Sequence, residues 1–169
     1  HQIENLAAIL SICSELELNE NQIQNSLNSY LGVYRRSQII KKNSKHIWID
    51  DFAHHPKELE ALISSVYNFF GQKRIFLIFQ PHTYTRTRDF LNLFSEILSK
   101  VDFLFLLEIY AARENDIYNI SSKDIFEKVT TKKFYQQDLI QAILENKENF
   151  DILLTVGAGN IFVLLKNDL

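Results

Sequence analysis

The sequence predicts an α/β fold with a mainly parallel sheet. Short, continuously apolar runs at 75–79, 103–107 and 152–156 are separated by stretches with helical periodicity. Continuous apolar runs are typical of strands that are covered on both faces, and their alternation with helices favours parallel strands. We therefore expect a Rossmann-like sheet with helices on both faces, preceded by two helices from a neighbouring domain.

Residues 1–32 carry two helical patterns. The first, over 2–18, has apolar residues at every third or fourth position, namely Ile3, Leu6, Ala7, Leu10, Cys13 and Leu16. Asn19 is placed to cap the second helix, with Gln22 completing a capping box. The expected buried face of this helix consists of Ile23, Leu27, Tyr30 and Leu31. Gly32 is expected to end it, which predicts a domain boundary between 1–32 and 33–169.

Residues 33–169 alternate between strand and helix patterns. Two strands at 38–40 and 46–49 flank a polar turn. Pro56 is a favourable first residue for the next helix, which Gly71 should end. The remaining expected elements, besides the three apolar runs, are helices over 90–98, 122–129 and 138–147, a short strand at 134–135, and a final short helix after Gly157-Ala158-Gly159.

Composition excludes several classes of function. Eighteen Lys and Arg against 21 Asp and Glu give a net charge of −3, which argues against a nucleic-acid partner. No apolar run reaches the length of a membrane span. The single cysteine, Cys13, and the lack of a signal-peptide pattern favour a cytoplasmic protein. Because the sequence begins at His1 and contains no methionine, we expect it to be part of a longer chain.

Polar strings follow three of the predicted strands, at 50–56, 80–88 and 108–114. Ligands of such sheets bind at the carboxyl ends of the strands, so these strings are the candidate site. A metal-dependent hydrolase is one possibility, since carboxylates and imidazoles are common metal ligands; its ligands would be Asp50, Asp51, His54, His55 and His82. The same residue types also cap helices. A non-catalytic nucleotide-binding or interaction module is a further alternative.

Other charged and glycine-rich features in and near these strings point less specifically to one function. Arg86 and Arg88 have the guanidinium geometry that binds carboxylates and phosphates. The Gly157-Ala158-Gly159 turn follows a strand and precedes a helix, so its backbone amides could face an anion. The turn lacks the full fingerprint of either a Walker loop or a dinucleotide site, and a tight turn explains it equally well.

Taken together, the strings resemble the C-terminal part of the Mur ligases. The resemblance rests on Asp50-Asp51-Phe52-Ala53-His54-His55-Pro56, on Phe79-Gln80-Pro81-His82-Thr83-Tyr84-Thr85-Arg86-Thr87, and on Thr155-Val156-Gly157-Ala158-Gly159-Asn160, in the order of the family. Residues 1–8 are similar to the end of the family's central ATPase domain, and 32–36 to its junction with the C-terminal domain. The Gln-Pro-His string favours the alanine-adding members over those that recycle murein tripeptide.

The resemblance implies ATP-dependent amide formation in peptidoglycan synthesis. ATP phosphorylates the carboxylate of UDP-N-acetylmuramate, and the amine of L-alanine attacks the acyl phosphate, with Mg²⁺ stabilising the phosphoryl charge. In the family, the phosphate-binding loop and the magnesium ligands belong to the central domain, which is expected upstream of His1. ATP and Mg²⁺ should thus be bound mainly outside this chain. By itself the chain is expected to be inactive, with no catalytic residue and no metal site.

The resemblance also implies binding residues. On the nucleotide side, His1 and Asn5 would lie near adenine, Arg36 near the phosphates, and Asp51 would accept hydrogen bonds from ribose hydroxyls. On the side of the muramate and the alanine, the same motifs imply contacts from His54, His82 and Arg86. Arg86 is expected to pair with the alanine carboxylate, a charge-assisted contact worth about 1.5–3 kcal/mol.

Two positions depart from the family pattern. Phe52 stands where many members have Tyr, and Thr83 where many have a second Arg. Arg113, in the string after the 103–107 strand, is our candidate for the missing charge beside Arg86.

Overall fold

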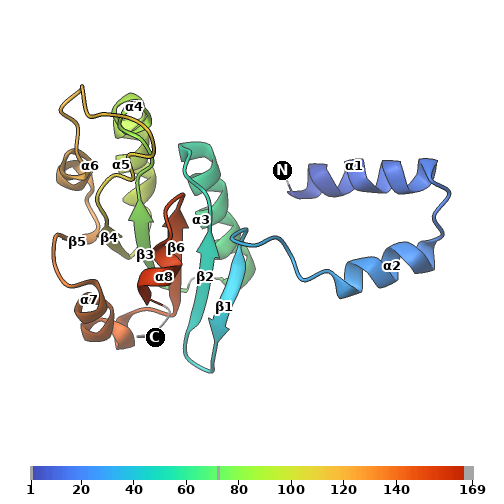
Figure 1. The fold of residues 1–169 in the computed structure, drawn as a ribbon. Coiled ribbons are helices and arrows are strands. Elements are labelled where there is room, and N and C mark those ends of the chain that lie inside the picture. Colours follow the sequence, from blue (N-terminus) through green and yellow to red (C-terminus); the bar gives the residue numbers. More distant parts are fainter. Residues whose placement is uncertain (1, 72, 166–169) are drawn as a thin grey trace. The chain divides into compact units, whose positions relative to one another are not determined.

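The computed structural model describes residues 2–71 and 73–165. The chain divides between Val33 and Tyr34 into two compact units, which are described separately (Figure 1). Among the described residues, no helix is both long and apolar enough to cross a membrane.

The first unit contains helices α1 (Gln2–Glu15) and α2 (Glu20–Ser29). The predicted capping box is present: the Asn19 side chain accepts from the Gln22 amide, and the Gln22 side chain accepts from the Asn19 amide, both at 3.0 Å. The expectation that Gly32 ends α2 is wrong. Tyr30 already has extended backbone angles (φ −74°, ψ 116°), so the helix stops earlier and Gly32 takes a positive φ of 84° in the following segment.

The expected buried face of α2 is also wrong. Leu27 and Leu31 are 47% and 100% exposed, and no residue of α2 is buried. An apolar stripe shows which face a helix can bury, but burial requires a surface to pack against. The two helices of this unit do not supply that surface.

The second unit is built on a six-stranded sheet, counted over the residues that the structure describes. Its strands are β1 (Gln38–Lys42), β2 (Ile47–Asp51), β3 (Ile75–Gln80), β4 (Phe103–Leu106), β5 (Lys132–Tyr135) and β6 (Ile152–Gly157), in the order β1-β2-β6-β3-β4-β5. The edge strand β1 is antiparallel to β2, and all other neighbours are parallel. The mainly parallel sheet is thus confirmed.

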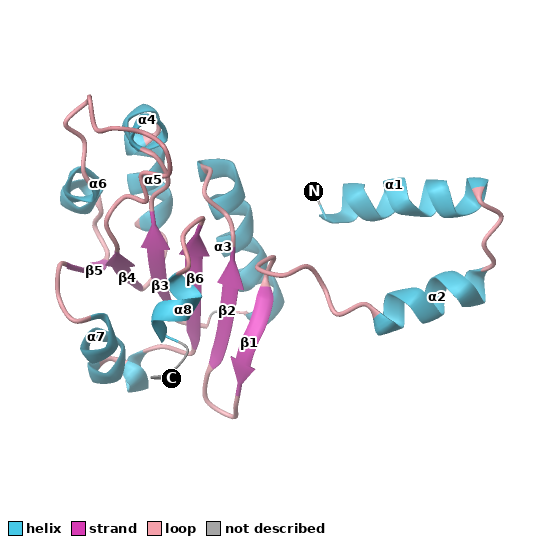
Figure 2. Cartoon of the chain, in the orientation of Figure 1, coloured by secondary structure: helices cyan, strands magenta, loops and turns pink. Residues whose placement is uncertain are grey.

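Helices cover both faces of this sheet, as predicted (Figure 2). They are α3 (Pro56–Phe70), α4 (Tyr84–Asp89), α5 (Leu91–Leu98), α6 (Ser122–Lys128), α7 (Leu139–Glu145) and α8 (Ile161–Leu165), with a 3₁₀ turn at Lys147–Asn149. Side chains of α3, α5 and α6 pack on one face, and those of α7 and α8 on the other. Helix α4 was not expected, because its sequence, YTRTRD, has no apolar stripe.

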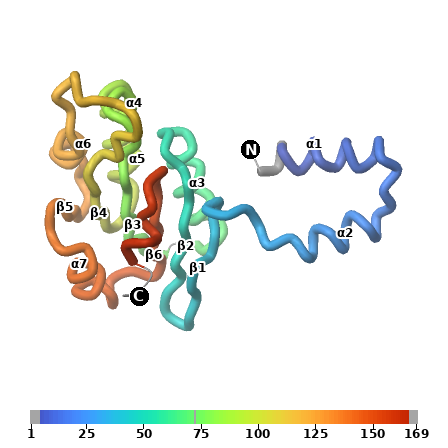
Figure 3. Tube along the Cα trace, in the orientation of Figure 1, coloured from blue at the N-terminus to red at the C-terminus, as the bar shows by residue number. Residues whose placement is uncertain are grey.

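The carboxyl ends of the parallel strands lie along one edge of the sheet (Figure 3). Strand β6 lies between β2 and β3 although it comes last in the sequence. The loop that follows β6 is therefore flanked by the loops that follow β2 and β3. We call this edge the rim, defined by residues 52–55, 81–89, 107–121 and 158–160, which include helix α4.

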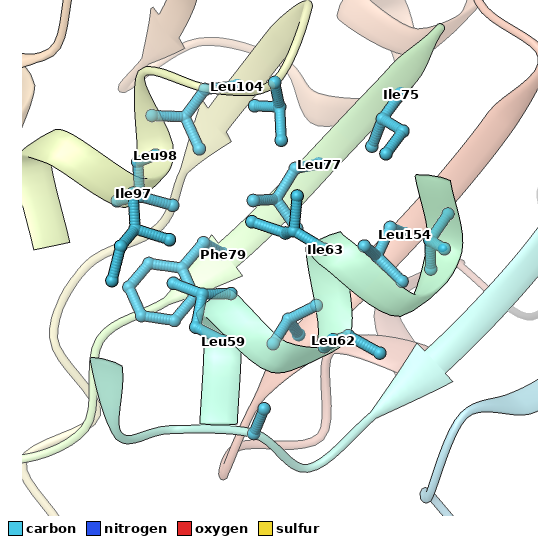
Figure 4. Close-up of a cluster of buried hydrophobic side chains, with 14 of the residues drawn as sticks. Leu59, Leu62, Ile63, Ile75, Leu77, Phe79, Ile97, Leu98, Leu104 and Leu154 are labelled. Carbon is cyan, nitrogen blue, oxygen red and sulfur yellow. The ribbon is translucent and has the colours of Figure 1, made fainter. Parts of the chain in front are cut away.

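The core beneath the rim fixes the positions of β3 and α3. In Figure 4, Leu59 and Ile63 of α3 lie against Leu77 and Phe79 of β3. All four side chains are at most 3% exposed. Burying a side chain of this size contributes about 1.5–3 kcal/mol relative to leaving it exposed, so these contacts hold the two rim loops at the ends of β2 and β3 in place.

Candidate functional site

A buried ion pair lies directly beneath the rim. Arg35 donates from Nε to Oδ2 of Asp50 at 2.9 Å and from Nη2 to the carbonyl of Gly157 at 2.6 Å. Thr155 donates its hydroxyl to Oδ1 of Asp50 at 2.5 Å and accepts from Nε1 of Trp48 at 3.1 Å. Both oxygens of Asp50 are thus engaged, and the pair ties the segment before β1 to β2 and β6. Arg35 belongs to the 32–36 junction string, but no role was expected for it.

Asp51 is held by backbone donors. Its Oδ2 accepts from the Ser37 amide at 2.6 Å, and its Oδ1 accepts from the Ala53 amide at 2.7 Å. The residue is only 6% exposed. A carboxylate has about four lone-pair sites, so acceptor capacity remains. In the structure Asp51 holds the loop, a role not expected from the family resemblance, which implies a ribose contact for it.

Two arginines lie beside Phe52. The guanidinium carbons of Arg35 and Arg36 are 5.3 and 5.8 Å from the centre of its ring, within the range of cation–π contacts. Arg36 is exposed. It is therefore a cation at the start of the second unit that remains accessible to a ligand.

His54 and His55 begin α3 in different ways. His54 contacts the carbonyl oxygen of Phe52 through Nδ1 at 2.9 Å, whereas His55 caps α3 by accepting from the Lys57 amide. Glu58 accepts from the amides of His54 and His55 at 3.0 and 3.2 Å. Burial acts to raise the pKa of Glu58, but these hydrogen bonds and the positive charges nearby outweigh it and lower that pKa.

His82 is surrounded by side chains from three parts of the rim. Nη1 of Arg86 lies 2.7 Å from its Nδ1. Its ring meets that of His54 edge to face at 5.2 Å and stacks on Tyr110 at 5.8 Å. Burial, Arg86 and His54 together lower the pKa of His82, against the opposing effect of Glu114. The structure thus brings together His54, His82 and Arg86, the three residues for which the resemblance implies substrate contacts.

The short helix α4 carries Arg86 and is fixed by the loop after β4. Thr83, with a positive φ of 65°, caps α4 and donates its amide to the carbonyl of Tyr110 at 2.9 Å. Glu114 accepts from the amide of Thr85 at 2.9 Å and from its hydroxyl. Hydrogen bonds from the side chain and the backbone of Thr85 lower the pKa of Glu114. Glu114 lies in the 108–114 string of the candidate site, but no role was expected for it, because its partner Thr85 is distant in sequence.

The glycine-rich turn after β6 accommodates Gln80. A Cβ at Gly159 would lie 1.9 Å from Oε1 of Gln80, and one at Gly157 would lie 2.7 Å from the Gln80 carbonyl oxygen. Gly157 also has a φ of 149°. These contacts explain both glycines by close packing, while the carbonyls of Gly157 and Ala158 accept from Arg35.

The ligand set of the hydrolase alternative is not assembled. In the part of the chain that the structure describes, no group of three His, Cys, Asp or Glu residues is placed to hold a metal ion. Asp50 binds Arg35 and Thr155, and His55 caps α3. These residues of the proposed cluster therefore have structural partners instead.

The sequence also singles out Asn5, His1, Arg88 and Arg113. Asn5 is an exposed residue of α1 in the first unit, and His1 lies outside the described residues. Arg88 pairs with Asp89 at 2.6 Å and lies over the ring of Tyr118. Arg113 is exposed. The structure places it on the same loop as Glu114.

Comparison with known proteins gives a consistent result. Residues 35–159 match the family described as Mur ligase, glutamate ligase domain. The chain is 40% identical over 163 residues to the UDP-N-acetylmuramate--L-alanine ligase of Cytophaga hutchinsonii, covering 95% of this chain and 35% of that protein. It is 39% identical over 167 residues to that of Agathobacter rectalis, covering 95% and 36%. The chain thus spans about a third of the length of these relatives.

Solved structures show the same fold. The UDP-N-acetylmuramate-alanine ligase of Thermotoga maritima superposes with a TM-score of 0.76 at 23% identity, covering 99% of this chain and 36% of that chain. A single domain from a ligase of Haemophilus ducreyi has a TM-score of 0.56 at 18% identity and covers 78% of this chain and 95% of that one. At these identities the likeness concerns the fold alone.

Proposed function

This chain belongs to the Mur ligase family, and on that premise we propose that it is the C-terminal part of an ATP-dependent ligase that joins L-alanine to UDP-N-acetylmuramate in bacterial peptidoglycan synthesis. The observation that carries the proposal is the grouping of His54, His82 and Arg86 at the rim. Residues 1–32 are then the helical end of the central ATPase domain, and 33–169 the C-terminal domain. The ligase is expected to act in the cytoplasm.

Arg86 binds the carboxylate of the incoming alanine. A guanidinium has five N–H donors in a planar fork, and the hydrogen bond to His82 uses one of them. The others can pair with both oxygens of a carboxylate, which fixes the orientation of the amino acid. Holding the amine of the amino acid against the acyl group converts a bimolecular step into an effectively unimolecular one.

Arg36 and Asp51 face the nucleotide. Arg36 is an exposed cation that would pair with a phosphate of ATP. Asp51 retains acceptor capacity beyond its two backbone contacts, which a ribose hydroxyl would use. Asn5, like His1, is proposed to lie near adenine in the complete protein.

Magnesium would neutralise charge on the phosphates during phosphoryl transfer. In the family that the motifs resemble, the magnesium ligands belong to the central domain. We therefore assign the ion, and most contacts to ATP, to the part of the ligase outside this chain.

The test compares the complete polypeptide with this chain alone. The complete protein is expected to turn over ATP continuously only when UDP-N-acetylmuramate and L-alanine are both present, and to form their amide, measured by mass spectrometry. The isolated chain should form none, because phosphoryl transfer depends on groups held elsewhere. ATP cleavage by the complete protein that does not require UDP-N-acetylmuramate would contradict the proposed reaction, and amide formation by the isolated chain would show that the catalytic centre is misplaced.

A further inference from the structure

The two rim histidines have opposite hydrogen-bonding polarity. Nδ1 of His54 lies 2.9 Å from the carbonyl oxygen of Phe52. A carbonyl oxygen only accepts, so this nitrogen must carry a hydrogen and donate it. In the neutral ring the other nitrogen, Nε2, then has a free lone pair. His54 therefore offers a hydrogen-bond acceptor.

His82 is held in the other tautomer. Its Nδ1 lies 2.7 Å from Nη1 of Arg86, and a guanidinium only donates. Nδ1 of His82 must accept, so Nε2 carries the hydrogen in the neutral ring. Burial and the neighbouring Arg86 lower the pKa of His82, which favours that neutral form. His82 therefore offers a donor, only 5.2 Å from the ring of His54.

From this geometry we propose that His54, through Nε2, takes the proton from the ammonium group of the incoming amino acid, while His82 donates from Nε2 to its carboxylate beside Arg86. The inference rests on the function proposed above. It assigns the proton acceptor for the amide-forming step to His54 and excludes His82, whose Nδ1 lone pair is already used.

The step balances as follows. The ammonium group loses one proton to Nε2 of His54 and becomes a neutral amine. The nitrogen lone pair attacks the acyl carbon, so a C–N bond forms, the C–O bond to phosphate breaks, and phosphate leaves with the electron pair. The second proton leaves the nitrogen with the phosphate, and His54 returns its proton to solvent.

The groups around the pair suit these roles. From α3, Oε2 of Glu58 lies 3.7 Å from Nδ1 of His54, and its lowered pKa keeps it ionised; it can stabilise the positively charged ring once the proton has been accepted. The positive charge of Arg36 also acts to lower the pKa of Glu58. Around His82 lie Arg86 of α4, Tyr110, and Glu114. No acidic side chain is in hydrogen-bond contact with His82 among the described residues.

Asparagine substitutions in the complete ligase test the assignment. In His54→Asn the amide nitrogen can keep the bond to Phe52, and in His82→Asn the amide oxygen can keep the bond from Arg86, but each variant loses Nε2. Each variant is assayed with L-alanine and with hydroxylamine, which is already unprotonated at neutral pH and captures acyl phosphates as hydroxamates. General-base catalysis is typically worth about 10²–10⁴-fold.

We expect His54→Asn to lose about 100-fold or more in kcat with alanine while hydroxamate formation changes by less than about threefold. Its rate with alanine should rise about tenfold per pH unit as the free amine becomes available. His82→Asn should chiefly raise KM for alanine. Equal losses of His54→Asn with both nucleophiles would overturn the proposal. It would also be overturned if His82→Asn, and not His54→Asn, lost about 100-fold or more in kcat with alanine while keeping its rate with hydroxylamine.

A second measurement does not depend on the variants. In the complete ligase with ¹⁵N-labelled histidine, NMR at neutral pH should show His54 protonated at Nδ1 and His82 protonated at Nε2. The reverse tautomers would overturn the inference. If the wild-type ligase forms hydroxamate but never the alanine amide, the proposed function fails, and that result is distinct from a failure of the His54 assignment.

Discussion

Arg35 and Asp50 form an ion pair inside the second unit, with 2.9 Å between Nε and Oδ2 and side chains that are 8% and 1% exposed. The same guanidinium donates to the carbonyl of Gly157. One residue of the segment before β1 is thereby fixed to the ends of β2 and β6, the two strands that lead into the rim loops.

Arg35→Met should destabilise the chain by about 3–5 kcal/mol, because it leaves the buried charge of Asp50 unpaired. Urea denaturation of the purified chain would measure the free energy of unfolding. Arg36→Met is the matched control. The Arg36 side chain, next to Arg35 in the sequence, is exposed, so this substitution should change stability by less than about 0.5 kcal/mol. Equal effects of the two substitutions would contradict a structural role for the buried pair.

The two glycines of the turn after β6 should respond differently to alanine. Gly157→Ala is expected to cost about 1–3 kcal/mol, since its Cβ would meet the Gln80 backbone and its φ is 149°. The Cβ of Gly159→Ala would instead meet the end of the flexible Gln80 side chain. Adding Gln80→Ala should therefore rescue Gly159→Ala and leave Gly157→Ala impaired, as measured by thermal denaturation. If Gln80→Ala rescued both glycine variants, the steric conflict would come from the Gln80 side chain alone.

In the complete ligase, Arg86→Ala should impair the use of alanine more than that of ATP. Losing a charge-assisted contact worth about 1.5–3 kcal/mol corresponds to about a tenfold to over a hundredfold loss. Steady-state kinetics with each substrate varied separately would show it. An unchanged dependence on alanine with a raised KM for ATP would reverse the assignment of the rim loops.

Asp51→Ala should chiefly raise KM for ATP. Because Asp51 also accepts from the amides of Ser37 and Ala53, the variant should be less stable as well. Asp51→Asn is the companion variant, since it keeps one acceptor oxygen. A loss of stability without any change in KM for ATP would show that Asp51 is a structural residue only.

If Arg113 supplies charge in place of the arginine that Thr83 replaces, Arg86→Ala and Arg113→Ala together should impair alanine use more than the sum of the single effects. The comparison requires kcat/KM for alanine in both single variants and the double variant. Additive effects would exclude this compensation.

Glu114 should make the chain sensitive to acid. Hydrogen bonds from Thr85 lower the pKa of Glu114 below the ordinary glutamate value of 4.5 in the folded state. Its contribution to stability is therefore present above pH 4.5 and is lost as the pH falls through the folded-state pKa. Melting temperatures of the wild type and Glu114→Gln should differ at neutral pH and converge as the pH falls below that value. A difference that does not depend on pH would contradict this account.

Local sequence signals predicted most of the fold. The apolar runs of β3, β4 and β6, the Asn19 capping box, and Pro56 and Gly71 at the ends of α3 were all recognisable, because each depends on neighbours close in sequence. Helix α4 was missed because its sequence has no apolar stripe. The bonds that fix it, from the Thr83 amide to the Tyr110 carbonyl and from the Thr85 amide to Glu114, reach a loop that is distant in sequence. The exposure of the apolar residues of α2 was not predicted, because an apolar stripe shows which face of a helix can be buried but not whether a surface is there to cover it.

The same distinction applies to the rim. By itself, the sequence determined a mainly parallel α/β sheet, and its motifs selected His54, His82 and Arg86. Only the tertiary structure decided that Asp50 is committed to Arg35 and Thr155, and that the two rim histidines have opposite polarity. Residue types and spacing define which groups are available, but a hydrogen bond depends on atoms within about 3 Å, and those distances arise when β6 inserts between β2 and β3.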